Sequence, residues 1–188
     1  MYEQRIQKLK VMLKDAIPEV RNAAAQAIDQ LQAKASIDRF QQILEGDDNA
    51  AKLRAVYALS ELDGDESLKL IVGALKNDSP DVRCTVIRIL GEKADPRTLG
   101  PVFEQLDDPD PAIQALVIEA LGNFRDRRLA DSFLSMLSSD NPDILTRVVI
   151  ALGRLGETRA EQAFVELLGH PQPAVREAAA GALGSLGA

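Results

Sequence analysis

The residue types that most often carry enzyme chemistry or bind metals are scarce in this chain. Its 188 residues include one histidine, His170, and one cysteine, Cys84. Zinc and di-iron sites of the usual kind need several His, Cys or carboxylate ligands, and a nucleophilic thiol needs a neighbour that lowers its pKa. We therefore predict no metal, no cofactor and no catalytic residue, with His170 in a turn and Cys84 as a small, partly buried side chain. No glycine-rich loop follows a strand pattern, so a phosphate-binding motif is not expected either.

Arginines with apolar neighbours are better candidates for chemistry, and their chemistry is recognition. Arg147, Ile150 and Arg154 are three and four residues apart. On a helix they share one face, with the apolar side chain between two guanidinium groups. Arginine binds carboxylates through two N–H groups at once, and it often carries binding energy in protein interfaces. This pattern favours binding of a group that is both acidic and apolar.

The segment that positions these arginines occurs six times at a fixed period of 31 residues. The six copies are PEVRNAAAQAIDQL (18–31), NAAKLRAVYALSEL (49–62), PDVRCTVIRILGEK (80–93), PAIQALVIEALGNF (111–124), PDILTRVVIALGRL (142–155) and PAVREAAAGALGSL (173–186). A fixed period in this range, without an insertion, indicates a solenoid of stacked repeats.

Each unit is predicted to form two helices. In the first helix, apolar residues recur at the spacing of an amphipathic helix, as at Leu99, Val102 and Leu106. The second helix begins at Pro in five of the six copies, because Pro suits the first helical turn. Acidic residues before the first helices are expected to cap them; these are Asp63, Asp95 and Asp126.

Small residues recur at two positions of the second helix. Those at one position are expected to let neighbouring helices approach closely; they are Ala27, Ala58, Ala120, Ala151 and Ala182. Those at the other either loosen the last turn or permit close packing; they are Gly91, Gly122, Gly153 and Gly184. The sequence thus predicts an all-α fold, a right-handed superhelix of six helix pairs in one domain over 1–188. The expected repeats are 3–32, 35–63, 66–94, 97–125, 128–156 and 159–187.

The composition excludes some classes of partner. Net charge is −7 and there is no Trp, which disfavours nucleic acid as a partner, because basic patches dominate such binding. No run approaches the ~18 apolar residues that span a bilayer, and the N-terminal MYEQRIQKLKVMLKD is too charged for a signal peptide. The single cysteine excludes an internal disulfide and fits a reducing compartment. We expect a cytoplasmic protein that binds no membrane.

The repeat also resembles a known family. The pattern Pro-x-Val-Arg-x-x-Ala-x-x-Ala-Leu-Gly-x-Leu-Gly, followed by Asp-Pro-Arg-x-Leu, is closest in PAVREAAAGALGSLG (173–187) and PDVRCTVIRILGEKADPRTL (80–99). It resembles the HEAT-like repeats of the phycobilisome-lyase type. The resemblance implies a binding scaffold whose second helices line a concave side. It also implies that the residues at one position of the repeat form a ladder of hydrogen bonds to turn carboxylates. The residues at this position, called here the arginine column, are Arg21, Lys52, Arg83, Gln114, Leu145 and Arg176. Leu145 cannot form such a bond, and Gln114 can do so only without a charge.

The concave face is therefore the predicted binding site, for a protein or peptide segment with acidic and apolar residues. The exposed positions of the second helices carry four Arg and four Glu, so this side is nearly neutral in a chain whose net charge is −7. Small side chains of the last repeat are expected to leave a shallow basin there; these are Ala178, Gly181 and Ser185. The candidate residues are Leu53, Arg54, Tyr57, Arg88, Leu116, Glu119, Arg147, Ile150 and Arg154. The alternative is that they are ordinary solvated side chains, with Arg88 and Glu92 forming an i,i+4 pair.

Other functions that the resemblance allows have less support. A bilin-lyase-like subunit would bind a tetrapyrrole or its carrier protein. The candidates for a tetrapyrrole site are Arg54, Tyr57 and Cys84. A HEAT-like DNA glycosylase needs a basic face and aromatic contacts, and a HEAT-repeat hydroxylase needs His-Glu pairs. We expect a non-enzymatic scaffold that is a monomer or a weak end-to-end dimer, because no predicted helix covers Leu183 and Leu186.

Overall fold

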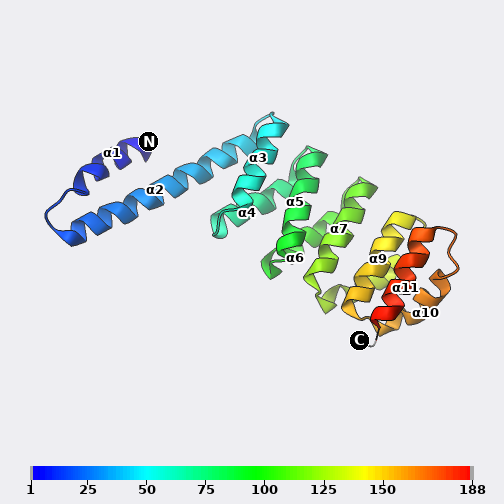
Figure 1. Ribbon diagram of the computed structural model, residues 1–188. Helices are drawn as coiled ribbons and strands as arrows, with labels where there is room; N and C mark the ends of the chain where they lie inside the picture. The colour runs from blue at the N-terminus through cyan, green and yellow to red at the C-terminus, as the bar shows by residue number, and fades with distance from the viewer. Residues whose placement is uncertain (1, 187–188) are drawn as a thin grey trace. The chain divides into compact units, whose positions relative to one another are not determined.

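The computed structural model describes residues 2–186, and the chain forms two compact units, Met1–Leu70 and Ile71–Ala188. All regular structure in the described residues is helical (Figure 1). This confirms the all-α prediction. The single domain over 1–188 stays a prediction, and the two units are described separately.

The first unit is built on one long helix. Helix α1 folds back along α2, and the Tyr2 hydroxyl donates a hydrogen bond of 2.7 Å to the Asp38 carboxylate. The α1 helix buries none of its residues and α2 buries only Ala24 and Ile28, so these two helices contribute little to a core. Its helices are α1 (Tyr2–Met12), α2 (Pro18–Glu45), α3 (Asn49–Ser60) and the first part of α4 (Asp65–Gly73).

The continuity of α2 corrects the sequence prediction. Two helices were expected, with a break between residues 32 and 35, but residues 18–45 form a single helix of 28 residues. Where later repeats do turn, a residue with positive φ precedes an acidic cap, as at Ala94 (φ 45°) before Asp95. The corresponding segment here is Gln-Ala-Lys at 32–34, three good helix formers without a cap. The fixed period predicted a boundary that the local residues do not encode.

Restoring the missing turn signals should break α2. The double substitution Ala33→Asp/Lys34→Pro places there the Asp-Pro pair that stands at Asp95 and Pro96. Proline inside a helix costs about 3 kcal/mol, and the new aspartate can cap a helix that begins at the proline. Spin labels at exposed Glu19 and Gln42, about 35 Å apart along a straight helix, should move closer in a double electron–electron resonance measurement.

The control is a helix-compatible pair of substitutions, Ala33→Glu/Lys34→Ala. Both labelled proteins carry Cys84→Ser, because the label would otherwise also attach to the one native cysteine. It should keep the long distance. A Pro variant that also keeps it would show that packing, and not the local residues, holds α2 straight.

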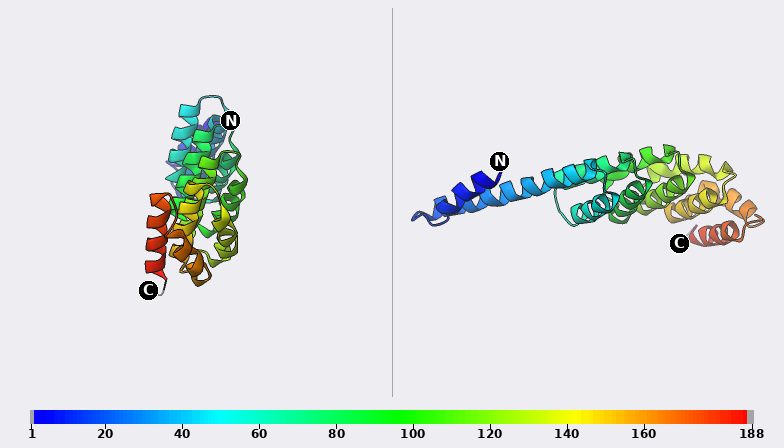
Figure 2. Two further views of the ribbon diagram at one scale, coloured as in Figure 1. Left: turned by 90° about the vertical axis from the view of Figure 1, so that its right-hand side faces the viewer. Right: turned by 90° about the horizontal axis from the view of Figure 1, so that it is seen from above.

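The second unit is a two-layer stack of helix pairs. Helices α5, α7, α9 and α11 pack side by side, while α6, α8 and α10 pack behind α7, α9 and α11 (Figures 1 and 2). The core lies between the two layers, where Val102, Phe133 and Phe164 of the back layer and Leu121 and Leu152 of the front layer are fully buried. After the end of α4, the elements are η1 (Ala74–Lys76), α5 (Pro80–Lys93), η2 (Pro96–Thr98), α6 (Leu99–Phe103), η3 (Glu104–Asp107), α7 (Pro111–Phe124), η4 (Arg127–Leu129), α8 (Ala130–Ser135), η5 (Met136–Ser138), α9 (Pro142–Leu155), η6 (Thr158–Ala160), α10 (Glu161–Leu167) and α11 (Pro173–Ser185).

Glycines set the spacing of the front layer. A Cβ atom on Gly91 would lie 2.6 Å from the Ala120 Cβ, and one on Gly153 would lie 2.9 Å from the Ala182 Cα. Each glycine thus receives the alanine of the next repeat at a distance that a side chain would forbid. Of the two roles considered for these glycines, the structure shows close packing at Gly91, Gly122 and Gly153, whereas a Cβ atom on Gly184 would meet no heavy atom within 4 Å.

Acidic caps join the helix pairs. Asp95 accepts the backbone N–H of Arg97 at 2.9 Å, and the Arg97 guanidinium donates to the same carboxylate. These hydrogen bonds lower the pKa of Asp95. Asp126 is held in the same way by Arg128, so two predicted caps are confirmed, while Asp63 stays a prediction. The next repeat uses Glu157, which sequence reasoning missed, and hydrogen bonds from its Arg159 lower the pKa of Glu157 to about 2.

The arginine column mainly binds main-chain carbonyls, which corrects the predicted ladder to carboxylates. In each case the acceptor lies six residues earlier, at the end of the first helix, where carbonyl groups lack helical partners. The pairs are Arg21 with Asp15, Arg83 with Asn77, Gln114 with Asp108 and Arg176 with His170, at 2.7–2.9 Å. Arg83 also reaches a carboxylate, that of Asp108 in the next repeat, at 2.8 Å, and both side chains are largely buried (14% and 4% exposed). Leu145 is itself buried.

Candidate interaction site on the second helices

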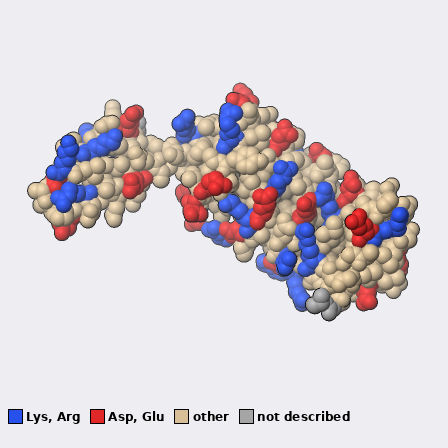
Figure 3. Space-filling model, viewed as in Figure 1, with Lys and Arg blue, Asp and Glu red and all other residues tan. Residues whose placement is uncertain are grey.

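The exposed side of α5, α7, α9 and α11, called here the second-helix face, carries six of the nine predicted site residues. Arg88, Glu119, Ile150 and Arg154 are exposed, and Leu116 and Arg147 are partly exposed. Basic and acidic side chains alternate over these helices (Figure 3). The face is therefore mixed in charge, as predicted, without a basic patch of the kind that binds nucleic acids.

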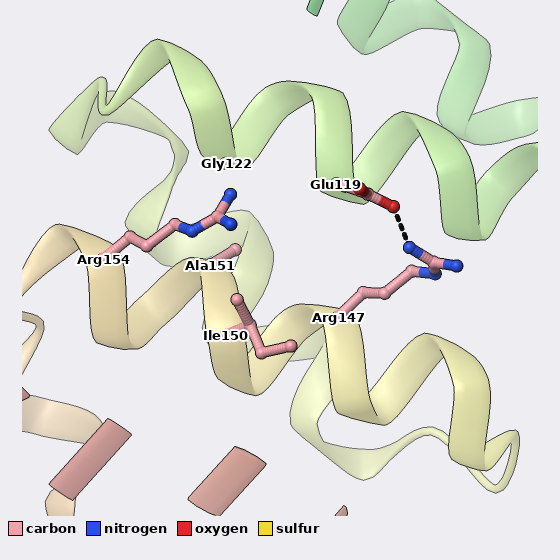
Figure 4. Close-up of a pocket in the computed structure, with 6 residues that line it drawn as sticks. All are labelled: Glu119, Gly122, Arg147, Ile150, Ala151 and Arg154. Atoms are coloured by element: carbon pink, nitrogen blue, oxygen red, sulfur yellow. Dashed lines mark hydrogen bonds and ion pairs between the residues drawn. The ribbon is translucent and has the colours of Figure 1, made fainter. Parts of the chain in front are cut away.

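Two arginines of α9 reach across a hollow to α7. The hollow has a volume of about 110 Å³ and is lined by Glu119, Gly122, Arg147, Ile150, Ala151 and Arg154 (Figure 4). Arg147 forms an ion pair with Glu119, and Arg154 Nη1 donates to Asn123 Oδ1 at 2.7 Å. Ile150 lies between the two arginines and is 39% exposed. The sequence placed these side chains on one face but did not show that both guanidinium groups already have partners.

A second, wider hollow lies between α9 and α11. Its volume is about 550 Å³. Ile150 and Arg154 line both hollows, so these two side chains of α9 lie between them. The remaining lining residues are Thr146, Gly153, Ala174, Glu177, Ala178, Gly181, Ala182 and Ser185. The small side chains expected to form a basin do line this hollow, while Thr146 and Glu177 were not among the predicted site residues.

The cross-helix contacts of the arginines are of a kind that a partner can replace. The side chains of Arg147 and Glu119 are 37% and 50% exposed, and pairs with such exposure are worth about 0–1 kcal/mol. A carboxylate that arrives with its own apolar contacts can therefore displace Glu119. Asn123 is neutral, so Arg154 keeps its full charge for a ligand. The contact between Arg154 and Asn123 could have been predicted from the repeat, because the two residues are one period of 31 residues apart.

Comparison with known proteins places the fold. A family model described as HEAT repeats matches residues 6–83, 67–148 and 130–188. The chain belongs to the HEAT-repeat family. No curated protein matches it.

Solved structures similar to this HEAT-repeat chain share its fold. One is in the CpcE–CpcF complex of phycocyanin lyase from Nostoc sp. PCC7120, with 20% identity and a TM-score of 0.67 over 80% of this chain and 65% of the other. Another is YibA of Escherichia coli, with 17% identity and a TM-score of 0.63 over 98% and 68%. A designed armadillo repeat protein in complex with the peptide (KR)4 has 14% identity and a TM-score of 0.57 over 96% and 99%. The predicted resemblance and the helical solenoid are thereby confirmed, and this chain spans 65% of the lyase chain.

Cys84 lies on helix α5 of the HEAT-repeat chain, and His170 lies between α10 and α11. Burial, followed by the charges of Asp110 and Asp81, raises the pKa of the Cys84 thiol, which is partly buried on α5. His170 lies in a turn, where its Nδ1 accepts the backbone N–H of Gln172 at 3.1 Å. Among residues 2–186, no three or more His, Cys, Asp and Glu side chains gather as a metal site. None of the described helices is long and apolar enough to cross a membrane.

The other three predicted site residues lie in the first unit. Leu53 is partly exposed on α3, while Arg54 and Tyr57 are exposed there, Tyr57 to 53%. Arg54 Nη2 lies 4.0 Å from the carboxylate of Asp48, the α3 cap. The structure brings these three together on α3, and their participation in a common site with α7 and α9 stays a prediction.

Proposed function

We propose that this HEAT-repeat chain is a non-enzymatic scaffold that binds a peptide or protein segment on its second-helix face. The observation that carries the proposal is the group on α9, where exposed Ile150 lies between Arg147 and Arg154 beside two hollows. Burying an isoleucine side chain fully is worth about 1.5–3 kcal/mol. Each arginine adds a directional site for a carboxylate. The ligand is therefore a segment with an apolar anchor flanked by Asp or Glu.

The charges on the second-helix face determine which class of ligand is expected. HEAT and armadillo repeats bind proteins or peptides, and the designed armadillo protein similar to this chain is in complex with a basic peptide, (KR)4. Here α9 presents two guanidinium groups, which repel such a peptide. The same architecture with this surface favours an acidic one.

A bilin-lyase-like role has less support than peptide binding. The likeness to the phycocyanin lyase chain, at 20% identity, concerns the fold. Of the residues that could contact a tetrapyrrole, Cys84 is partly buried with a raised pKa, so its thiol is a weak nucleophile at neutral pH.

Peptide selection tests the proposal directly. A random peptide library displayed on phage would be selected against the purified chain, and the enriched peptides titrated by fluorescence anisotropy. We expect peptides with Asp or Glu beside Leu, Met or Phe. Affinity should fall at least about tenfold, or 1.4 kcal/mol, for Arg147→Glu/Arg154→Glu.

A matched control separates the site from net charge. Lys76→Glu/Lys93→Glu makes the same charge change at exposed residues outside both hollows, and it should leave affinity within about twofold. Both variants must first show the circular dichroism of the wild type. Equal loss in the two, or no loss in either, contradicts the proposed site.

A further inference from the structure

The hollow between α9 and α11 is about five times larger than the one between α7 and α9, with volumes of about 550 and 110 Å³. The reason is a change of side chains from one repeat to the next. At the positions where α9 carries Ile150 and Arg154, α11 carries Gly181 and Ser185. The α11 side of this hollow is therefore lined mostly by small residues, and Ile150 of α9 provides its large apolar side chain.

The α11 side of this hollow has open space at Gly181. A Cβ atom on Gly181 would have no heavy atom within 4 Å, in contrast to Gly153, whose Cβ would lie 2.9 Å from the Ala182 Cα. Gly153 is thus needed for packing, whereas nothing in the packing of the described residues requires a glycine at 181. The open space is bounded on the other wall by Ile150.

Opposite charges stand at the two ends of this hollow. Near the ends of the two helices, Gly153 of α9 lies against Ala182 of α11. Near their beginnings, Thr146 of α9 and Ala174 of α11 line the same hollow. The two helices therefore run in the same direction. Exposed Glu177 therefore lies toward the beginning of the groove and Arg154 toward its end. In this register they are separated by about 9 Å along the helix axes. Arg154 uses one N–H for Asn123 and has others available.

We infer that the α9–α11 hollow is a specificity pocket for one bulky apolar side chain of a partner helix, with a basic residue of that helix at Glu177 and an acidic one at Arg154. The inference rests on the proposed function, because it concerns the same face. It adds the order of the charged residues along the ligand helix and places the apolar anchor of that helix in the α9–α11 hollow. On a ligand helix, the spacing on one face that comes nearest to this separation is i and i+7, about 10.5 Å along the axis, with the apolar anchor between them at i+3 or i+4.

The test uses a defined probe and NMR of the 188-residue chain. The probe is an Ala-rich helical peptide of about 16 residues, long enough for a marginal helix in water, with Lys, Leu and Glu at i, i+3 and i+7. A second probe has Ala in place of the Leu. With the first probe at millimolar concentration, we expect amide shifts along α9 and α11, including that of Gly181, and with the second at least a fivefold weaker affinity.

Gly181→Leu fills the pocket from the α11 side and is the decisive variant. It should weaken the Leu probe at least tenfold without loss of stability, because leucine favours a helix more than glycine does. The matched control, Gly73→Leu, makes the same change at another exposed glycine with open space around it, and it should bind as the wild type. For Arg154→Glu, a probe with Lys in place of its Glu should recover the lost affinity.

The outcomes distinguish this inference from the proposed function. If Arg147→Glu/Arg154→Glu weakens selected peptides while Gly181→Leu binds the Leu probe normally, the pocket is refuted and the acidic-ligand face stands. If neither probe shifts any amide of α9 or α11, the pocket is refuted as well. If Gly181→Leu instead reduces self-association in analytical ultracentrifugation, a second copy covers the hollow and the inference is wrong.

Discussion

Arg83→Ala is expected to destabilise the chain by about 3–5 kcal/mol, the usual cost of removing one partner from a buried ion pair. Arg83 is 14% exposed and donates to the Asp108 carboxylate, which is 4% exposed. It also donates to the Asn77 carbonyl, so it joins two successive turns of the solenoid. Its loss leaves a buried carboxylate with only the backbone N–H of Asp110 as a donor among the contacts described. Urea denaturation of the full chain at pH 7 measures the change.

The neighbouring repeat provides the control for this variant. Where the third repeat has Arg83 and the next turn Asp108, the following repeat has Gln114 and Ser139. The double variant Arg83→Gln/Asp108→Ser copies this neutral pair. It should cost much less than Arg83→Ala, because no charge is left buried. Equal losses in the two variants would show that the packing of Arg83, and not its charge, is what stabilises the turn.

The loss should also depend on pH. Burial alone raises the pKa of Asp108, but hydrogen bonds from Arg83 and from the Asp110 N–H, together with the Arg83 charge, outweigh it and the pKa is lowered. A carboxyl with a lowered folded-state pKa stabilises the protein above its unfolded pKa of about 4, and this stabilisation disappears as pH falls through the folded-state value. The difference between wild type and Arg83→Ala should therefore be largest near neutral pH and shrink below about pH 4.

Gly91→Ala should destabilise the chain by about 1–3 kcal/mol, the range for overpacking a close-packed core. Its Cβ would lie 2.6 Å from the Ala120 Cβ and 2.8 Å from the Ala120 Cα. Because one of these atoms belongs to the α7 backbone, relief requires a whole helix to move. Gly122→Ala should cost less, since its Cβ would lie 3.2 Å from the Ala151 Cβ. Urea denaturation monitored by circular dichroism gives the order.

The control for helix propensity is Gly181→Ala, in which the new Cβ meets open space. Alanine is favoured over glycine in a helix by about 1 kcal/mol, so this variant should be as stable as the wild type or more so. If Gly91→Ala were also stabilising, the front layer would have room to spread and the glycines would not set its spacing.

Sequence periodicity predicted most of the second unit because its repeats carry local signals for the beginnings of their helices. The second helices begin at the predicted prolines, as α5 does at Pro80 and α9 at Pro142, and Asp95 and Asp126 cap where expected. In the first unit the same period failed at residues 32–35. A period transfers the average repeat to every copy, whereas a helix ends only where its own residues stop it.

The sequence by itself determined the family, the helix pairs of the second unit and the side chains that share one face of each second helix. All of these depend on spacing within one helix or on the repeat of 31 residues. The tertiary structure decided what lies between helices. It shows that the glycines receive alanines, that Arg147 pairs with Glu119, and that Gly181 opens a hollow while Gly153 is closed by Ala182. These contacts depend on distances between neighbouring backbones, which the spacing of residues along one helix does not contain.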